Sequence, residues 1–238
     1  MSASELRLTN ADLEAMPEDG NRYEVIDGEL YVSGAPGFIN QIILLRIVSA
    51  FVDYLRGHPI GEIAPGVGVV FDDYDGVIPD LVFATHERVR KALAGGRFHA
   101  APEIVIEILS PCPSNDRRDR HVKLRRYATR GVGEYWIVDP ENHSVEVHRR
   151  DVAGDPVFEQ SLRRGDELTS GFLPGFAVRA DTLLASLPSK RPPAAAVLPT
   201  RAGIPHQPRR ETTELKPSGR QARSGVSVSR PDTFPPRA

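Results

Sequence analysis

The stretch that decides the fold is "PEIVIEILSP", residues 102–111, in which mostly β-branched apolar residues run between two prolines. A short apolar run of this kind predicts a buried β-strand. Because side chains alternate along a strand, Ile104, Ile106 and Ile108 share one wholly apolar face, and Glu107 lies on the other. A lone carboxylate in a buried strand is costly unless another group offsets its charge. Glu107 therefore marks the face on which we expect a functional site.

The sequence on either side of this strand predicts a domain that mixes strands and helices. Two alternating runs joined by Asp27-Gly28 predict a hairpin, and apolar residues at helical spacing predict a long helix over 38–57. Further elements expected include a short helix over 11–16 capped by Asn10, one or two strands over 61–73, a strand over 76–85, a short helix over 86–94, a helix over 114–131, strands over 133–139 and 144–150, short strands beyond residue 155 and a closing helix over 180–187. Strands and helices do not strictly alternate, which favours an α/β (α+β) fold with a central mixed sheet flanked by helices.

Composition narrows the class of protein. No uninterrupted apolar run approaches the roughly 18 residues that cross a bilayer, and the acidic N-terminus lacks the pattern of a signal peptide. Cys112 is the only cysteine, which excludes an internal disulfide and a cysteine-based zinc cluster. We expect a cytoplasmic protein that does not act on membranes.

The charge divides the chain into two regions. From Lys190 onward there are ten basic and three acidic residues, against 20 basic and 29 acidic residues in 1–189. The C-terminal region also holds nine prolines and a single aromatic residue, Phe234, so it cannot bury enough apolar surface to order itself. We predict one folded domain, 1–188, followed by a disordered, basic, Pro-rich tail, 189–238. Whether the tail contacts nucleic acid or is only a solvated extension stays open.

A second carboxylate stands among apolar residues in "VIPDLVFA", residues 77–84. As a strand, this stretch puts Asp80 on one face with Ile78 and Val82, and Pro79 places it at an edge or at a strand start. If Asp80 and Glu107 come together, their charges repel. A Mg²⁺ ion removes that conflict, because it prefers one or two carboxylates and retains several waters.

The helix after Glu107 supplies basic groups. Asp119, Lys123 and Tyr127 lie at i, i+4 and i+8, on one helix face. A lysine beside a metal-bound phosphate can stabilise negative charge in the transition state or orient an attacking water. Seven of the fourteen residues from 117 to 130 are basic, which is a candidate footprint for a phosphate backbone.

The order of these motifs carries a resemblance. "PDLVF", "EIVIEILSP" and "DRHVKLRRYATRGVGEYWIVDP", together with the early "YEVIDGELY", resemble the Uma-two-type endonuclease family, a branch of the restriction-endonuclease-like PD-(D/E)XK nucleases. The resemblance covers roughly residues 10 to 185. It implies a restriction-endonuclease-like core and Mg²⁺-dependent hydrolysis of phosphodiester bonds in DNA, with Mn²⁺ as a substitute. Nucleases of this architecture often pair, so a homodimer is a further expectation.

The resemblance also implies site residues. Asp80 and Glu107 match the two acidic metal ligands, and the backbone carbonyl of Ile108 matches the main-chain ligand. Leu109 occupies the position of the usual lysine, which selects Lys123 on the following helix as its displaced equivalent.

Two N-terminal positions complete the comparison. Glu24 matches an acidic position that assists metal binding in related nucleases. Relatives often carry a histidine at the start of the long helix, where this chain has Asn40. Asparagine cannot titrate near neutrality, so a slower enzyme is expected if that histidine moves a proton in relatives.

Other interpretations stay open. Taken singly, Asp80 fits a strand end, Glu107 fits a buried pair with an arginine, and Lys123 fits a helical pair with Asp119. For the whole chain, the alternatives are a catalytically inactive nucleic-acid-binding protein of the same fold and an interaction module whose acidic domain binds a basic partner. The net charge of −9 on residues 1–189 argues mildly against tight, non-specific DNA binding.

Overall fold

The computed structural model describes residues 7–110 and 117–185. The chain divides into two units, Met1–Arg191 and Pro192–Ala238. The second unit lies outside the described residues, so the disordered tail and the boundary at 188 stay predictions. The helices are α1 (Asn10–Leu13), α2 (Phe38–Gly57), α3 (His86–Ala92), the π-helical turn η1 (Arg118–Lys123), α5 (Leu124–Arg130) and α6 (Ala180–Leu184).

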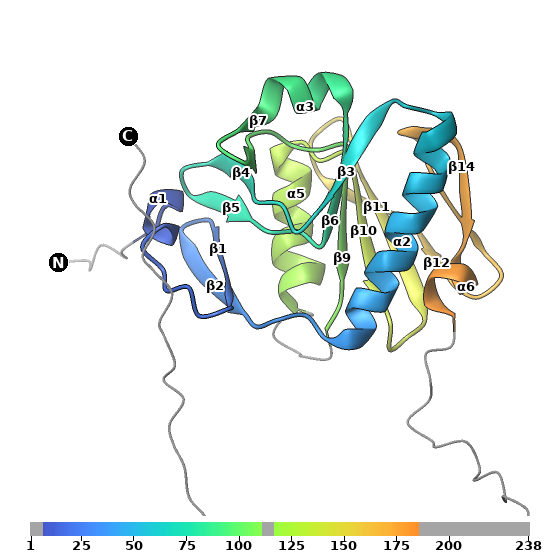
Figure 1. Ribbon diagram of the computed structural model, residues 1–238, viewed down its shortest axis with the longest axis horizontal. Coiled ribbons are helices and arrows are strands. Elements are labelled where there is room, and N and C mark those ends of the chain that lie inside the picture. Colours follow the sequence, from blue (N-terminus) through green and yellow to red (C-terminus); the bar gives the residue numbers. More distant parts are fainter. Residues whose placement is uncertain (1–6, 111–116, 186–238) are drawn as a thin grey trace, which may run out of the picture. The chain divides into compact units, whose positions relative to one another are not determined.

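A mixed six-stranded sheet forms the centre of the described domain (Figure 1). Its strands, in spatial order, are β12 (Pro156–Leu162), β11 (Ser144–Arg150), β10 (Glu134–Asp139), β9 (Ile104–Ile108), β6 (Leu81–Thr85) and β3 (Gly61–Pro65). β9 and β10 pair in parallel, and the other neighbours are antiparallel. The predicted mixed sheet is therefore confirmed.

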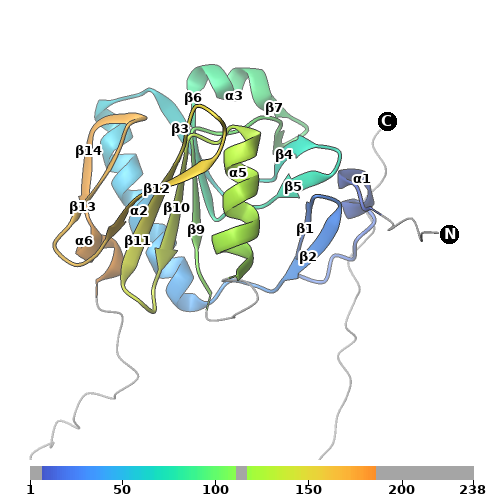
Figure 2. The same cartoon turned by 180° about the vertical axis from the view of Figure 1, so that it is seen from behind.

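Helices cover both faces of this sheet (Figures 1 and 2). On one face, α2 packs Ile43, Ile47 and Phe51 onto the isoleucines of β9, and the Phe51 and Trp136 rings lie 5.8 Å apart. On the other face, Tyr127 of α5 packs with apolar residues of β9 and β10. The two faces of β9 thus separate as the alternation predicted, with Glu107 on the α5 side.

A second six-stranded sheet lies beside α5 (Figure 2). Its strands, in spatial order, are β2 (Glu29–Ser33), β1 (Arg22–Ile26), β5 (Asp75–Val77), β4 (Val69–Asp72), β8 (Arg97–Phe98) and β7 (Leu93–Ala94), and a separate hairpin joins β13 (Glu167–Ser170) to β14 (Leu173–Arg179). The predicted turn between β1 and β2 is confirmed: Asp27 and Gly28 have φ of 55° and 82°. Such left-handed pairs match the twist of a two-residue hairpin.

Two predicted elements need correction. The strand expected over 76–85 is interrupted, because β5 ends at Val77 and β6 begins at Leu81. Asp80 therefore precedes a strand instead of lying inside one. The physical reason is that Pro79 has no N–H, and the Ile78 N–H is bound by a side chain, Glu24 Oε1, at 2.8 Å.

Helix α1 also differs from its prediction. It begins at Asn10 and is capped by Thr9, whose hydroxyl and the Asp12 carboxylate form a capping box.

The helix expected over 114–131 is described only from residue 117. Gly131 ends it in the left-handed conformation, φ 93°, as the sequence indicated.

Helix α2 is more apolar than its role in the core requires. By length and composition it could cross a membrane, and it is the one such helix among the described residues. The search for uninterrupted apolar runs in the sequence did not predict this. Only 28% of its most apolar window is buried. Its inner face is nevertheless committed to the protein core.

Gly61→Ala is expected to destabilise the protein by about 2–3 kcal/mol, as overpacking does. A Cβ at Gly61 would lie 2.3 Å from the Ala84 carbonyl oxygen, so β3 and β6 would have to separate. Gly57→Ala is the matched control: a Cβ there meets nothing within 4 Å, and alanine should stabilise the end of α2 slightly. Urea unfolding of both variants checks this, and equal midpoints would contradict it.

Candidate active site

Glu107 faces a buried lysine. Lys123 Nζ donates to Glu107 Oε1 at 2.8 Å, and the Tyr127 hydroxyl donates to the same oxygen at 2.9 Å. The Lys123 side chain is only 2% exposed. The carboxylate is thus compensated by a lysine of the following helix, not by an arginine.

Glu24 brings β1 to the same lysine. Its Oε1 lies 2.9 Å from Lys123 Nζ, and Arg118 approaches its other oxygen at 3.6 Å. Glu24 is buried, although glutamates in hairpins are usually exposed. Lys123 therefore joins two carboxylates from two different sheets.

Asp80 lies at the more open edge of the cluster. Its Oδ2 accepts the Ile108 N–H at 2.8 Å, and Arg22 lies 3.2 Å from Oδ1. The side chains of Asp80 and Arg22 are 13% and 30% exposed. Since Glu107 precedes Ile108, the carboxylates of Asp80 and Glu107, 27 positions apart in sequence, meet at the carboxyl end of β9.

Asn40 fixes the main chain at this end of β9. Its side-chain amide donates to the carbonyl oxygens of Ile108 and Leu109, at 2.9 and 3.1 Å. Asn40, at the position where the resemblance leads us to expect a histidine, thus holds the carbonyl of Ile108 that was predicted to bind metal.

The electrostatics of the cluster are dominated by burial. Burial raises the pKa of the Glu107 carboxyl to about 8; Lys123 opposes this shift, and the carboxylates of Asp119 and Asp80 add to it. Burial also opposes the charge on Lys123, but Glu107, Glu24 and Asp119 outweigh it and raise the pKa of the lysine. The pKa of Glu24 is lowered despite its burial, because Lys123 and Arg118 face it. Lys123 is therefore a permanent cation.

The π-helical turn η1 brings further charges inward. Arg118, Asp119 and Lys123 are all buried, and Arg118 Nε donates to Asp119 Oδ1 at 3.1 Å. A π turn widens the helix by one residue, and such turns often lie at functional sites. Arg22 and Arg118 were not predicted as site residues. The alternation of β1, which puts Arg22 and Glu24 on one face, was the available signal for the first.

The donor set suits a hard divalent ion. Among the described residues, no three His, Cys, Asp or Glu side chains group as a metal site. Mg²⁺ does not need three, since it binds through one or two carboxylates and keeps waters. Asp80 and Glu107, with the oriented Ile108 carbonyl, offer the oxygens it prefers. The catalytic and metal-binding assignments of Asp80, Glu107, Ile108, Lys123 and Glu24 stay predictions.

The basic residues of 117–130 are largely used inside the protein, which corrects their interpretation as a free phosphate footprint. Arg118 pairs within the cluster, Arg120 with Asp139, and Arg126 and Arg130 with Asp75. A positive side chain with an internal partner contributes little to an external field.

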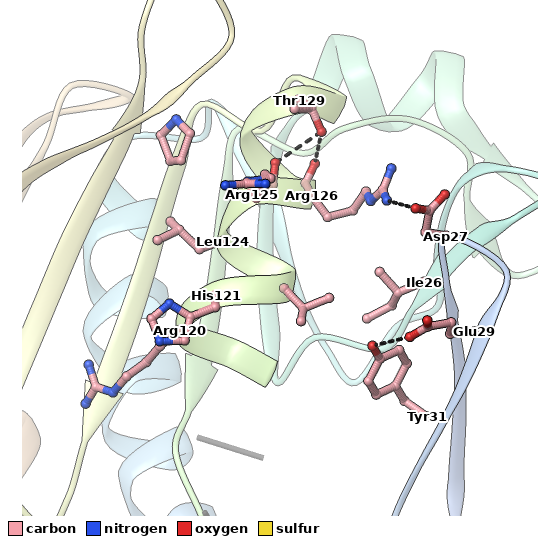
Figure 3. Close-up of a pocket in the computed structure, with 12 residues that line it drawn as sticks. Ile26, Asp27, Glu29, Tyr31, Arg120, His121, Leu124, Arg125, Arg126 and Thr129 are labelled. Atoms are coloured by element: carbon pink, nitrogen blue, oxygen red, sulfur yellow. Dashed lines mark hydrogen bonds and ion pairs between the residues drawn. The ribbon is translucent and has the colours of Figure 1, made fainter. Parts of the chain in front are cut away.

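A cavity of about 610 Å³ lies between the β1–β2 hairpin and the outer face of the helix formed by η1 and α5 (Figure 3). Arg126 reaches Asp27 at 3.2 Å there, and the Tyr31 hydroxyl donates to Glu29. The cavity is thus lined by both signs of charge and is separate from the inward-facing cluster.

Comparison with known proteins identifies the family to which this chain belongs. Residues 11–183 match the Uma2 family, described as "Putative restriction endonuclease". An uncharacterized protein of Synechocystis sp., slr1290, is 26% identical over 137 residues, which cover 56% of this chain and 69% of the relative.

The fold has a solved counterpart. A putative nuclease belonging to DUF820 from Anabaena variabilis has the same fold, with a TM-score of 0.62 and 21% identity over 74% of this chain and 97% of that one. The family match spans the sheet, α2 and the whole charged cluster, so this chain belongs to the Uma2 family of restriction-endonuclease-like proteins.

Proposed function

We propose that the protein is a Mg²⁺-dependent endonuclease that hydrolyses phosphodiester bonds in DNA. The observation that carries this proposal is the meeting of Asp80 and Glu107 at the end of β9, with Lys123 held 2.8 Å from Glu107. Membership of a family of nuclease type supports the reaction class. The metal, the DNA substrate and the role of the lysine are the proposed parts.

Each residue has a role in this proposal. The carboxylates of Asp80 and Glu107 and the Ile108 carbonyl would hold the ion. When bound, the ion lowers the pKa of a water and neutralises the scissile phosphate. Asn40 keeps the carbonyl in place, and Lys123 stabilises the charge that develops on the phosphate.

The charges of the cluster support a dication and a phosphate together. Among the described residues it holds four carboxylates, Glu24, Asp80, Glu107 and Asp119, against three cations, Arg22, Arg118 and Lys123. With Glu107 ionised, as metal binding requires, one negative charge is in excess. A divalent ion and one phosphodiester would add a single positive charge, which leaves the assembled site neutral.

Asp80→Asn is expected to reduce metal-dependent cleavage by about 100-fold or more, because it weakens one of two charged ligands. Plasmid nicking in Mg²⁺ or Mn²⁺, with EDTA as the metal-free arm, measures this. Glu141→Gln, an exposed carboxylate in the β10–β11 turn, is the matched control and should cleave as the wild type does. Cleavage by Asp80→Asn at the wild-type rate would remove Asp80 from the site.

A second candidate function is nucleic-acid binding without catalysis. The observation that favours it is that Lys123 and Arg22 already compensate both carboxylates without a metal. Binding that persists in EDTA, with no cleavage at any Mg²⁺ or Mn²⁺ concentration, would select it. We further propose that the protein acts as a homodimer, through the surface argued next.

A further inference from the structure

Helix α2 carries a second apolar stripe on the side away from the core. The buried positions of the helix are Asn40, Ile43, Ile47 and Phe51. Opposite them, six residues are spaced four, three, four, three and four positions apart, with the exposed Gln41 and Asp53 on either side: Phe38, Ile42, Leu45, Ser49, Val52 and Arg56. This is the spacing of a coiled-coil seam, in which every 3.5 residues one side chain meets a facing helix. We call these six residues the outer seam.

The outer seam is exposed. Phe38, Leu45 and Val52 are 75%, 67% and 37% exposed, and Ile42 is half-buried. Single exposed apolar residues are ordinary, but a contiguous apolar patch marks an interaction surface. α2 lies in front of the central sheet in Figure 1 and behind it in Figure 2, so one side of the helix faces away from the sheet.

We propose that the outer seam is a homodimer interface in which α2 packs antiparallel against α2 of a second copy. The six positions are symmetric about residue 47, so a two-fold axis there pairs Ile42 with the partner's Val52 and Leu45 with the partner's Ser49. It also places Phe38 beside the partner's Arg56. An isologous interface requires such self-complementarity.

Each of these pairs is chemically matched. Ile42 and Val52 are both apolar, the small Ser49 leaves room for Leu45, and a guanidinium over an aromatic ring is attractive. A parallel pair would instead oppose Arg56 to Arg56 and Ser49 to Ser49. The antiparallel arrangement is therefore the one the sequence favours.

A lipid membrane is a less suitable partner for the outer seam than a second copy of α2. A membrane-spanning helix needs lipid or protein around its whole circumference, and the outer seam includes two polar residues, Ser49 and Arg56. A helix lying on a membrane surface needs a cationic polar face, whereas the opposite face of α2 is the protein core.

The dimer has a geometric consequence that rests on the proposed function. Asn40, at the start of α2, contacts the candidate site, and the two-fold axis brings it level with the partner's Tyr54. At about 1.5 Å per residue, the two sites lie about 21 Å apart along the helix axis. Two separated sites suit the two strands of a duplex.

Sedimentation velocity of the full chain tests the interface, independently of any cleavage. The wild type should be a dimer, and Leu45→Glu should weaken dimerisation roughly 100-fold, because it buries two unpaired carboxylates. Val152→Glu, which changes a fully exposed apolar residue in the β11–β12 turn, is the matched control and should leave the dimer intact. Unchanged circular dichroism shows that each variant folds.

The orientation is tested by Leu45→Glu/Ser49→Lys. In the antiparallel pair the new carboxylate faces the partner's new ammonium, so dimerisation should recover to within about 10-fold of the wild type. In a parallel pair like charges would meet, and continued monomer would overturn the proposed orientation.

Three further results would overturn the interface. The first is a wild-type protein that stays monomeric up to about 100 µM, and the second is a dimer that Leu45→Glu does not weaken. The third is a monomer that binds anionic liposomes and loses this binding in Leu45→Glu. None of them bears on cleavage, so failure here leaves the proposed nuclease intact.

Discussion

Glu107→Gln is expected to abolish metal-dependent cleavage, by about 1,000-fold or more, while making the metal-free protein more stable at alkaline pH. The loss follows because the amide removes one of the two negative ligands proposed for the ion. The hydrogen bonds from Lys123 and Tyr127 both end on Oε1, and the amide oxygen can still accept them.

The gain in stability has a definite pH window. The pKa of Glu107 is raised by burial to about 8 in the folded protein, against about 4.3 for an unfolded glutamate. A group with a raised folded pKa contributes stability that is complete below the unfolded value and is lost as the pH rises through the folded one. Between about pH 4.5 and 8 the wild type therefore loses a few kcal/mol that Glu107→Gln keeps.

Urea unfolding of metal-free wild type and Glu107→Gln at pH 5 and pH 8.5, beside plasmid nicking, measures both effects. Glu103→Gln is the matched control, since Glu103 is also buried, directly before β9, but pairs with Arg88 at 2.6 Å. That variant should lose stability and keep its cleavage. A Glu107→Gln protein that nicks plasmid normally would contradict the metal site.

The sequence predicted this site as far as local patterns reach. Alternation along 104–108 separates the two faces of β9, and the periodicity of 38–57 defines α2, because both depend on neighbours in the chain. Asp80, Glu107 and Lys123 were identified because ionisable residues stand out in apolar surroundings. Their convergence at the end of β9 was an inference that the structure supports.

The sequence could not predict the ion pairs of the site, because their partners are distant in the chain. The Arg22–Asp80 and Arg118–Glu24 pairs join residues 58 and 94 positions apart, and no local spacing encodes them. The basic run of 117–130 indicated a phosphate surface, yet most of its arginines face carboxylates of β1, β5 and β10 or the loops beside them. Charge type is visible in a sequence, but the partner of a charge is not.

Lys123→Met should have the opposite effect on stability to Glu107→Gln, although both change the same 2.8 Å contact. Removing the lysine leaves Glu24, Glu107 and Asp119 without their common cation, and breaking a buried ion pair from one side costs about 3–5 kcal/mol. Urea unfolding at pH 8.5 measures this. Arg125→Met, an exposed change on the same helix, is the matched control and should be nearly neutral.

The double variant Glu24→Gln/Lys123→Met shows whether excess negative charge is the cause. It should recover part of the stability lost in Lys123→Met, because one unpaired buried carboxylate has gone. If the two effects simply add, the lysine acts through packing, and the surplus of carboxylates would not explain the site. Recovery would mean that Lys123 stabilises the protein by neutralising buried carboxylates, whose mutual repulsion then limits the stability of the Lys123→Met variant.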